Sequence, residues 1–283
     1  MYYLFNFKHL NCLFFLYAYF ICLFKNIFLC IFYILPCGKY TIKYVSCEMM
    51  LSIFSDFDDT ISIGDIGNKL FIHFGEFDKY ISEFALGRIT VRELNILLCA
   101  SIPTKTTIEE IEDFALEQDI DPYFLPFVNF CQNNNYKLHI VSDGYGIYIN
   151  QILKKYNLDF LPKYHNELIK TTSGFVPVFY GASESCNCST ASCKRNVILN
   201  NSTEEDIMVY IGDGTTDFCA AEHCDIIFAK SDLANYCRKN KIPYHHFKTF
   251  FDVQRILQSL LQTKKIKQRN QSFLKRKSAF EAE

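Results

Sequence analysis

Between residues 50 and 263, short apolar runs alternate with longer stretches in which apolar residues recur every three or four positions. Short runs of this kind are typical of buried β-strands, and the wider spacing is typical of helices that bury one face. Strands are predicted at residues 51–55, 137–141, 207–211 and 226–228. Residues 66–134 predict helices, with Pro103 as an interruption and residues 106–110 as a capped restart.

The rest of this region predicts a small hairpin at residues 164–180 and helices at residues 147–156, 193–199 and 251–261. Strands separated by helices imply a mainly parallel sheet that is covered on both faces. The expected fold class is α/β, a doubly wound, Rossmann-like sheet with a helical cap inserted after the first strand. The expected parts are an apolar N-terminal segment (1–48), a core (49–64 and 130–263), the cap (65–129) and a basic tail (264–283).

Polar residues stand at the ends of three of the predicted strands: Asp56 directly follows the first, Ser142 directly follows the second, and Asp213 comes after Gly212 at the end of the third. Parallel sheets bind their ligands at the carboxyl ends of the strands, so these side chains should converge. The first end is crowded, because Asp56, Asp58 and Asp59 fall within four positions. Unit charges about 4 Å apart repel by about 4 kcal/mol at a protein-like dielectric, so a cation or hydrogen-bond donors must hold such carboxylates charged.

Charge is unevenly distributed along the 283 residues. Residues 1–47 contain no Asp or Glu, whereas residues 264–277 hold seven Lys or Arg. The body between residues 49 and 263 has 18 basic and 28 acidic side chains, a net charge of about −10. An acidic body argues against a nucleic-acid partner, and the basic tail is expected to be a solvated, poorly ordered end.

The N-terminal segment has three interpretations. Residues 10–24 and 27–35 are together long enough to span a bilayer, although Lys25 near the middle would cost about 2.5–3.5 kcal/mol. A cleaved signal peptide would need small residues near Cys37, where an Ala-x-Ala site is absent. The composition also fits translated AT-rich upstream DNA, with a start at Met49 or Met50. We favour the last interpretation and expect a cytoplasmic protein, with membrane attachment through residues 10–35 as the alternative.

Thirteen cysteines are present, and five of them lie before residue 48. The other eight are not spaced like a small secreted disulfide framework, so a reducing compartment is expected. Cys186, Cys188 and Cys193 are candidate soft ligands for zinc. A structural zinc site normally needs four ligands, and no His or fourth Cys lies in register. Buried or redox-sensitive thiols are therefore the favoured interpretation.

Four motifs occur in order along the chain. They are Asp-x-Asp-x-Thr at Asp56, a strand ending in Ser142, a later Lys at Lys194, and Gly-Asp-Gly-x-x-Asp around Asp213. Together they resemble the haloacid dehalogenase superfamily, and a helical cap after the first motif resembles its phosphoserine phosphatase group. The Cys-rich run before Lys194 is similar to the run found in phosphatases of the methionine salvage type. Those phosphatases act on 2-hydroxy-3-keto-5-methylthiopentenyl-1-phosphate.

The resemblance implies a role for each motif. Asp56 would be the nucleophile that forms an aspartyl phosphate, and Asp58 the general acid and then the base. Mg²⁺ would be held by the Asp56 carboxylate, the Asp58 backbone carbonyl and Asp213, with Asp217 nearby. The phosphoryl group would be bound by Thr60, Ser142, Asp143, Gly144 and Lys194.

Other interpretations of these residues stay open at this point. Asp56 and Asp58 could form a turn, Asp213 and Asp217 a helix cap, and Ser142 an N-cap. The site lysine has four competitors, Lys154, Lys155, Lys163 and Lys170.

The function expected from the resemblance is Mg²⁺-dependent hydrolysis of a small phosphorylated metabolite. Phosphoserine hydrolysis and phosphotransfer on the same scaffold are the alternatives. A non-catalytic, membrane-tethered binding module is the alternative of another class. A module that only binds has no need of a general acid, so the presence of Asp58 argues against it.

Overall fold

The computed structural model describes residues 30–34, 40–44, 50–181, 186, 188 and 190–281, and the chain divides into two units, Met1–Met49 and Met50–Glu283. In the first unit, β1 (Cys30–Ile34) and β2 (Tyr40–Tyr44) pair antiparallel. Residues 10–29, which carry most of the proposed membrane anchor, lie outside the described residues. None of the helices that are described is long and apolar enough to cross a bilayer.

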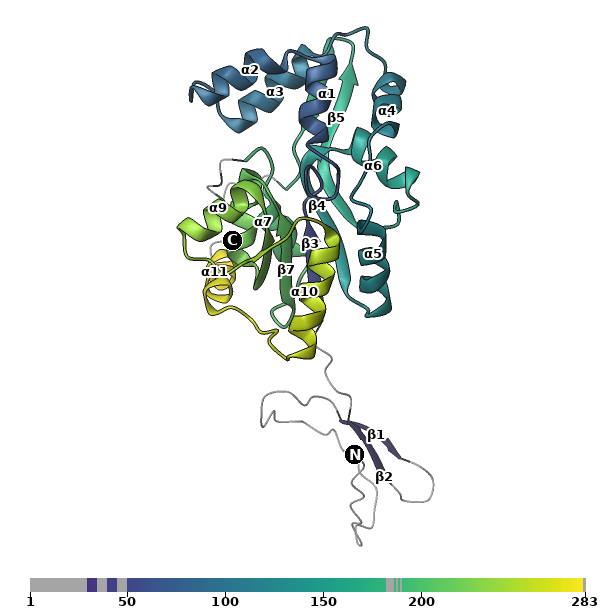
Figure 1. Ribbon diagram of the computed structural model, residues 1–283, viewed down its shortest axis with the longest axis vertical. Helices are drawn as coiled ribbons and strands as arrows, with labels where there is room; N and C mark the ends of the chain where they lie inside the picture. The colour runs from purple at the N-terminus through teal and green to yellow at the C-terminus, as the bar shows by residue number, and fades with distance from the viewer. Residues whose placement is uncertain are drawn as a thin grey trace. The chain divides into compact units, whose positions relative to one another are not determined.

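The second unit is built on a seven-stranded sheet with the order β6-β5-β4-β3-β7-β8-β9 (Figure 1). Its strands are β3 (Leu51–Ser55), β4 (Lys137–Tyr145), β5 (Lys163–Thr171), β6 (Gly174–Val178), β7 (Ile207–Gly212), β8 (Ile226–Ala229) and β9 (His245–His246). Neighbouring strands from β5 to β9 run parallel, and β6 pairs antiparallel with β5. The predicted α/β, mainly parallel fold class is confirmed.

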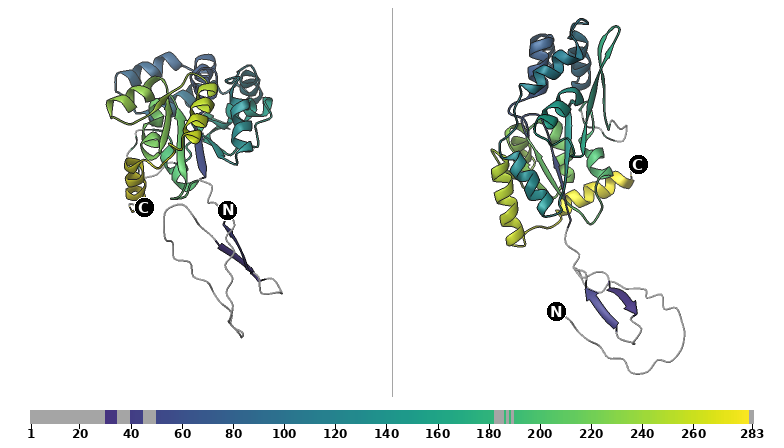
Figure 2. Two further views of the ribbon diagram at one scale, coloured as in Figure 1. Left: turned by 60° about the horizontal axis from the view of Figure 1, so that its bottom comes forward. Right: turned by 90° about the vertical axis from the view of Figure 1, so that its right-hand side faces the viewer.

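Helices cover both faces of this sheet, which explains why its central strands are continuously apolar. In β7, Val209 and Ile211 belong to one hydrophobic cluster, whereas Met208 and Tyr210 belong to the other. The first face is covered by α5 (Phe124–Asn133), α6 (Gly146–Lys155) and α10 (Phe250–Gln262), and the second by α7 (Lys194–Asn200), α8 (Phe218–His223) and α9 (Ser231–Lys239). Figure 2 shows the sheet between these helices.

Five helices lie between β3 and β4 in the chain. The first four are α1 (Ile66–Phe74), α2 (Phe77–Ala85), α3 (Val91–Ser101) and α4 (Ile108–Leu116), and the fifth is α5. In Figure 1, α1, α2 and α3 lie beyond the carboxyl ends of the central strands. The predicted restart after Pro103 is confirmed, because Thr107 and Glu110 form a capping box at the start of α4. α1, α2 and α3 are therefore placed to cover a ligand at that edge of the sheet, whereas α4 packs against α6.

The end of the cap and the position of the hairpin differ from what the sequence predicted. The predicted end of the cap at residue 129 falls inside α5, which packs against β4 and α10. We therefore propose that the cap ends before Phe124. The predicted hairpin is β5 and β6, but β5 extends the main sheet beside β4, and Lys170 Nζ donates to the Thr106 carbonyl at 2.7 Å. The hairpin is thus attached to the link between α3 and α4.

The prediction of a poorly ordered basic tail is wrong for residues 270–281, which form α11 (Asn270–Glu281). This helix packs against α8. Arg276 is 3% exposed, and its Nη1 lies 3.1 Å from Asp225 Oδ1, which also accepts the Ser272 hydroxyl at 2.6 Å. A run of basic residues is normally exposed to solvent, but here Arg276 forms a buried ion pair with Asp225 of the core.

Candidate active site

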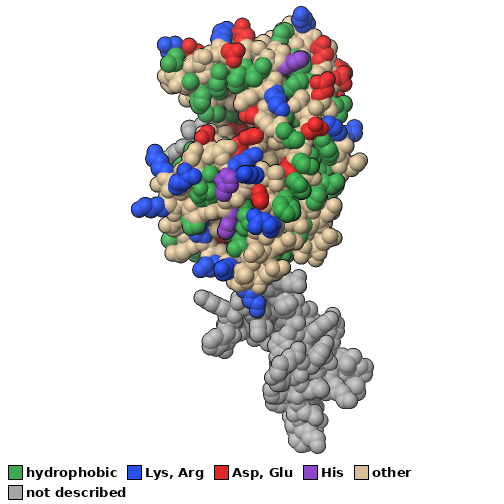
Figure 3. All heavy atoms as spheres, in the orientation of Figure 1, with side chains coloured by type: hydrophobic (Ala, Val, Ile, Leu, Met, Phe, Trp, Pro, Cys, Tyr) green, Lys and Arg blue, Asp and Glu red, His purple; other side chains and the backbone are tan. Residues whose placement is uncertain are grey.

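The polar strand ends meet around a cavity of about 260 Å³ at the carboxyl edge of the sheet. It is lined by Asp56, Asp58, Ser142, Asp143, Gly144, Lys194 and Asp213, together with residues of α1, α2 and α3. Figure 3 shows acidic side chains gathered at a hollow below α2 and α3. The predicted convergence of Asp56, Ser142 and Asp213 is confirmed.

Asp56 is held in place by its backbone and by one carboxylate oxygen. Its backbone N–H donates to the Ile211 carbonyl of β7 at 2.9 Å, which extends the sheet pairing by one residue. Its Oδ1 accepts the Phe57 backbone N–H at 2.7 Å and lies 2.8 Å from Lys194 Nζ. Burial and the charges of Asp217 and Asp213 raise the pKa of Asp56 well above its usual range, while Lys194 opposes that rise.

Asp58 faces the cap side of the cavity, where both of its oxygens accept hydrogen bonds. Oδ1 accepts the backbone N–H groups of Ile66 and Gly67 at 3.0 and 3.3 Å, at the start of α1. Oδ2 accepts the Tyr148 hydroxyl at 2.6 Å. Burial and the nearby Asp65 raise the pKa of Asp58 to about 7, and these hydrogen bonds limit the rise. The group can therefore both give and take a proton near neutral pH.

Lys194 is 3% exposed and lies between two carboxylates. Its Nζ is 2.8 Å from Asp56 Oδ1 and 2.7 Å from Asp217 Oδ1. Burial would lower its pKa, but the charges of Asp217, Asp56 and Asp143 raise it above the ordinary range, so the amine stays protonated. Lys194 thus provides a fixed positive charge beside Asp56.

The four competing lysines do not reach this site. Lys155 pairs with Asp119 at 3.0 Å, Lys163 donates to the Asp159 carbonyl, Lys170 donates to the Thr106 carbonyl, and Lys154 is exposed on α6. Lys194 is the one Lys or Arg among the described residues that line the cavity.

Asp217 is fully occupied by donors of the protein. Its Oδ1 accepts from Lys194 and from the Tyr210 hydroxyl at 2.6 Å, and its Oδ2 accepts the backbone N–H groups of Asp213 and Gly214 at 2.9 and 3.0 Å. It therefore fixes the turn that carries Asp213. Asp213 Oδ1 accepts the Thr60 hydroxyl at 3.0 Å, so Thr60 supports a carboxylate and is not among the described residues lining the cavity.

The end of β4 supplies a compact polar turn. The Gly144 backbone N–H donates to Ser142 Oγ at 2.9 Å, and Ser142 Oγ lies 3.5 Å from Asp58 Oδ2. The Asp143 carboxylate turns to Ser192 and accepts its backbone N–H at 3.1 Å. A Cβ at position 144 would collide with the Tyr148 hydroxyl and with Asp58 Oδ2, so this close approach requires glycine.

The oxygens of Asp56, Asp213 and Asp217 lie within 4.8 Å of one another, a spacing that a single metal ion can bridge. Burial and Asp217 raise the pKa of Asp213 to about 7. Two carboxylates with raised pKa values indicate that Lys194 alone does not neutralise this cluster. The donor set is all oxygen, which suits a hard divalent cation.

Two features of the site had no signal in the sequence. In the sequence, Tyr148 has the spacing of an ordinary buried helix residue. Its hydroxyl nevertheless makes the shortest of the hydrogen bonds described for the Asp58 side chain. The cap contributes an apolar wall to the cavity, made by Phe71, Phe84, Val91, Leu94 and Leu98. Helical spacing predicted that some of these residues would be buried, but not that they would face a ligand cavity.

Comparison with known proteins gives the family. Residues 94–266 match the sequence model of the family described as "Putative Phosphatase". The protein named 2-hydroxy-3-keto-5-methylthiopentenyl-1-phosphate phosphatase from Bacillus thuringiensis is 30% identical over 226 residues, covering 76% of this chain and all of the relative. Its namesake from Bacillus cytotoxicus is 28% identical over 223 residues, with the same coverage.

Solved structures show the same fold. A phosphoserine phosphatase carrying a phospho-aspartyl intermediate analogue superposes with a TM-score of 0.56 at 19% identity, covering 75% of this chain and 99% of the other. A substrate-bound phosphoserine phosphatase gives 0.55 at 19% identity with the same coverage. Because the family model spans more than half of the chain, the chain belongs to this family and is a phosphatase with the haloacid dehalogenase fold.

Proposed function

We propose that the protein is a Mg²⁺-dependent phosphomonoesterase that forms an aspartyl phosphate on Asp56 and acts on a small metabolite with an apolar tail. The observation that carries this proposal is the position of Asp56, which is fixed by Lys194 on one side and has Asp58 across the same cavity. A nucleophile, a cation and a titratable acid around one cavity are the groups that phosphoryl transfer requires.

Both hydrogen-bonded contacts of the Asp56 side chain converge on Oδ1, from Lys194 and from the Phe57 backbone. An oxygen that accepts two donors is a weaker nucleophile, so we assign the attack on phosphorus to Oδ2. Lys194 and the backbone N–H groups of the turn after Ser142 would stabilise the charge that spreads over the phosphoryl oxygens. The P–O bond to the leaving group breaks as the bond to Asp56 forms.

Asp58 would give its proton to the leaving alkoxide and then take a proton from the water that hydrolyses the aspartyl phosphate. Its pKa of about 7 suits both roles at neutral pH. The two backbone N–H groups of α1 and the Tyr148 hydroxyl keep the carboxyl oriented during both steps.

Mg²⁺ would be held by the carboxylates of Asp56 and Asp213 and by the Asp58 backbone carbonyl. When bound, it supplies positive charge that lowers the repulsion between the carboxylates and the phosphoryl group. Asp217, whose oxygens are occupied by four protein donors, would act on the metal through the turn that carries Asp213. Thr60 would orient the Asp213 carboxylate by its hydrogen bond.

The cavity favours a substrate whose tail is apolar. Its cap wall carries five apolar side chains, and Lys194, the one cation of the described lining, is already paired with two aspartates. The carboxylate of phosphoserine would therefore meet no free positive charge on that wall, whereas a methylthio tail would be buried against it. This supports the substrate named for the Bacillus relatives, with phosphoserine as the second candidate.

The test compares both substrates on the purified full chain. We expect inorganic phosphate to be released in the presence of Mg²⁺, with kcat/KM for the methylthio substrate at least about 100-fold above that for phosphoserine. Leu94→Asn, which changes the cap wall, should lower kcat/KM for the methylthio substrate about tenfold, since a buried apolar side chain contributes about 1.5–3 kcal/mol. The matched control is Ile96→Asn on the same helix, because Ile96 is 43% exposed.

Equal or greater kcat/KM for phosphoserine would contradict the substrate proposal, as would a Leu94→Asn variant that behaves like Ile96→Asn. Phosphate appearing on an acceptor hydroxyl in place of inorganic phosphate would make the protein a phosphotransferase.

The cysteines described between residues 50 and 281 are not joined in disulfides. This supports a reducing compartment, and we propose the cytoplasm.

A further inference from the structure

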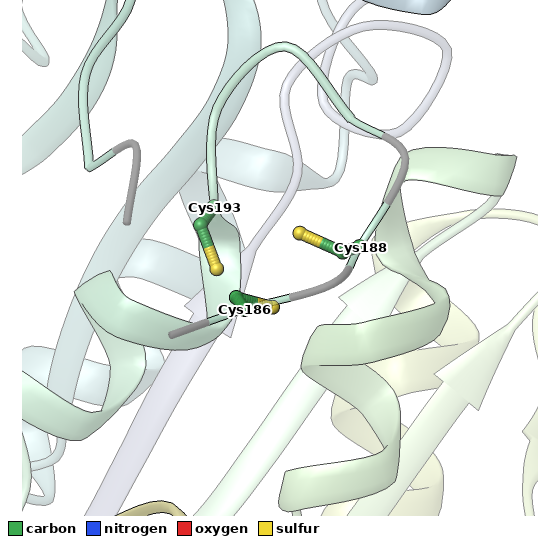
Figure 4. Close-up of side chains that lie close together, drawn as sticks. All are labelled: Cys186, Cys188 and Cys193. Carbon is green, nitrogen blue, oxygen red and sulfur yellow. The ribbon is translucent and has the colours of Figure 1, made fainter. Parts of the chain in front are cut away.

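Three cysteines on the segment before α7 direct their sulfur atoms toward one another. The Sγ atoms of Cys186, Cys188 and Cys193 all lie within 4.8 Å of one another. Figure 4 shows the three side chains facing a common centre. Cys193 is buried, while Cys186 and Cys188 are partly exposed, so the cluster lies just below the surface.

A fourth cysteine, which the sequence analysis did not find, joins this cluster from a different part of the chain. Cys219 lies on α8, and its Sγ is 3.6 Å from that of Cys186. The thiol of Cys188 also contacts those of Cys193 and Cys219. Sequence spacing did not indicate this fourth Cys, because only the fold brings Cys219 close to Cys186 and Cys188.

We propose that Cys186, Cys188, Cys193 and Cys219 bind one structural zinc ion. A tetrahedral site with Zn–S bonds of about 2.3 Å places its sulfur atoms about 3.8 Å apart. The 3.6 Å between the sulfur atoms of Cys186 and Cys219 is close to that edge, and the sulfur atoms of Cys186, Cys188 and Cys193 all lie within 4.8 Å of one another. A thiol is a weak hydrogen-bond donor, so four neighbouring thiols gain little from each other without a cation.

The site has the geometry of a closed, structural centre rather than a catalytic one. Four sulfur ligands fill a tetrahedral shell and leave no position for water or substrate. A single ion fits better than a cluster of several irons, which would hold its cysteines further apart. The other four cysteines described in this unit, Cys99, Cys131, Cys224 and Cys237, are buried and lie outside this cluster, so clustering is not general among the described cysteines of the unit.

The position of the cluster connects it to the phosphatase site. Cys193 directly precedes Lys194, and Cys219 follows Asp217 by two residues. Lys194 and Asp217 form the 2.7 Å ion pair of the active site. A zinc ion shared by the two segments would clamp them together immediately behind that pair, and would act as a positioning element.

The test measures metal content, which does not depend on the proposed reaction. The full chain, expressed in zinc-containing medium and purified without chelator, is analysed by mass spectrometry of the elements. We expect about one zinc per chain. Cys219→Ser and Cys186→Ser should lose it, whereas Cys237→Ser, which changes a buried thiol of α9 outside the cluster, should keep it.

A second measurement uses only the wild-type protein, so it still tests the proposal if a cysteine variant fails to fold. Wild-type protein exchanged with Co²⁺ should show the sulfur-to-metal charge-transfer band and the strong visible bands of a tetrahedral thiolate site. Less than about a tenth of a zinc per chain in wild-type protein would overturn the proposal. Zinc retained by folded Cys219→Ser, iron in place of zinc, or octahedral Co²⁺ spectra would also overturn it.

Discussion

Replacement of Lys194 by Met tests the electrostatics of the site most fully. Met has a similar length but no charge, so Lys194→Met removes the cation that lies 2.8 Å from Asp56 and 2.7 Å from Asp217. Both carboxylates are buried and would lose their shared partner. Removing one partner of a buried ion pair destabilises a protein by about 3–5 kcal/mol.

The same substitution should remove catalytic stabilisation. Loss of one well-placed group that stabilises transition-state charge lowers the rate by about 10²–10³. We therefore expect Lys194→Met to lose about 3–5 kcal/mol of unfolding free energy and at least about 100-fold in kcat/KM. Urea denaturation monitored by circular dichroism gives the first quantity, and hydrolysis of p-nitrophenyl phosphate with Mg²⁺ gives the second.

Lys155→Met is the matched control, since Lys155 pairs with Asp119 at 3.0 Å on the surface. Solvent screens that pair, so its loss should change the unfolding free energy by less than about 1 kcal/mol and leave kcat/KM unchanged. The reasoning is refuted if Lys194→Met is as stable as this control. It is equally refuted if the variant keeps more than about a tenth of wild-type kcat/KM, a change of less than about 1.4 kcal/mol.

Three further predictions concern the acid, the metal and the C-terminal helix. The Tyr148 hydroxyl donates a hydrogen bond to the ionised form of Asp58, so Tyr148→Phe should raise the pKa of Asp58. The pH at which kcat/KM falls on the alkaline side should then rise by about one unit, and an unchanged or lower pH for this fall would contradict the prediction. Ca²⁺ should inhibit in competition with Mg²⁺, because it prefers more ligands at longer distances and can bind the Asp56 oxygen that we propose attacks phosphorus; full activity in excess chelator would argue against any metal role. Arg276→Met should lose about 3–5 kcal/mol of unfolding free energy in urea through its buried pair with Asp225, whereas Lys275→Met, on an exposed pair with Glu222, should stay within about 1 kcal/mol.

The sequence was sufficient where function depends on position along a strand. Asp56 and Asp213 each follow an apolar run, and parallel strands bring their carboxyl ends to one edge, so the convergence could be predicted without coordinates. The order of the four motifs also favoured Lys194 over the four other candidate lysines. Its pairing with Asp56 and Asp217 agrees with that choice.

The sequence was insufficient where a residue acquires its role from a distant part of the chain. Cys219 lies next to Cys186 because of how α8 packs. Arg276 can be buried as a cation because the core provides Asp225 as its partner. Tyr148 has the pattern of a core residue, and its hydroxyl matters because Gly144 leaves room for it beside Asp58. Local patterns record periodicity and turns, whereas these partnerships depend on tertiary contacts.

The covalent role of Asp56 is the central claim, and detection of the phosphorylated enzyme tests it most directly. The Asp58→Asn variant lacks the base that we propose for the second step, while p-nitrophenyl phosphate has a leaving group that needs no proton. The variant is therefore mixed with this substrate and Mg²⁺, quenched in acid, digested with pepsin and analysed by tandem mass spectrometry. We predict one phosphoryl group on Asp56 and none in a matched sample of Asp56→Asn, which should also be inactive. Release of p-nitrophenol without a phosphorylated peptide, or with the phosphoryl group on another residue, would contradict the account.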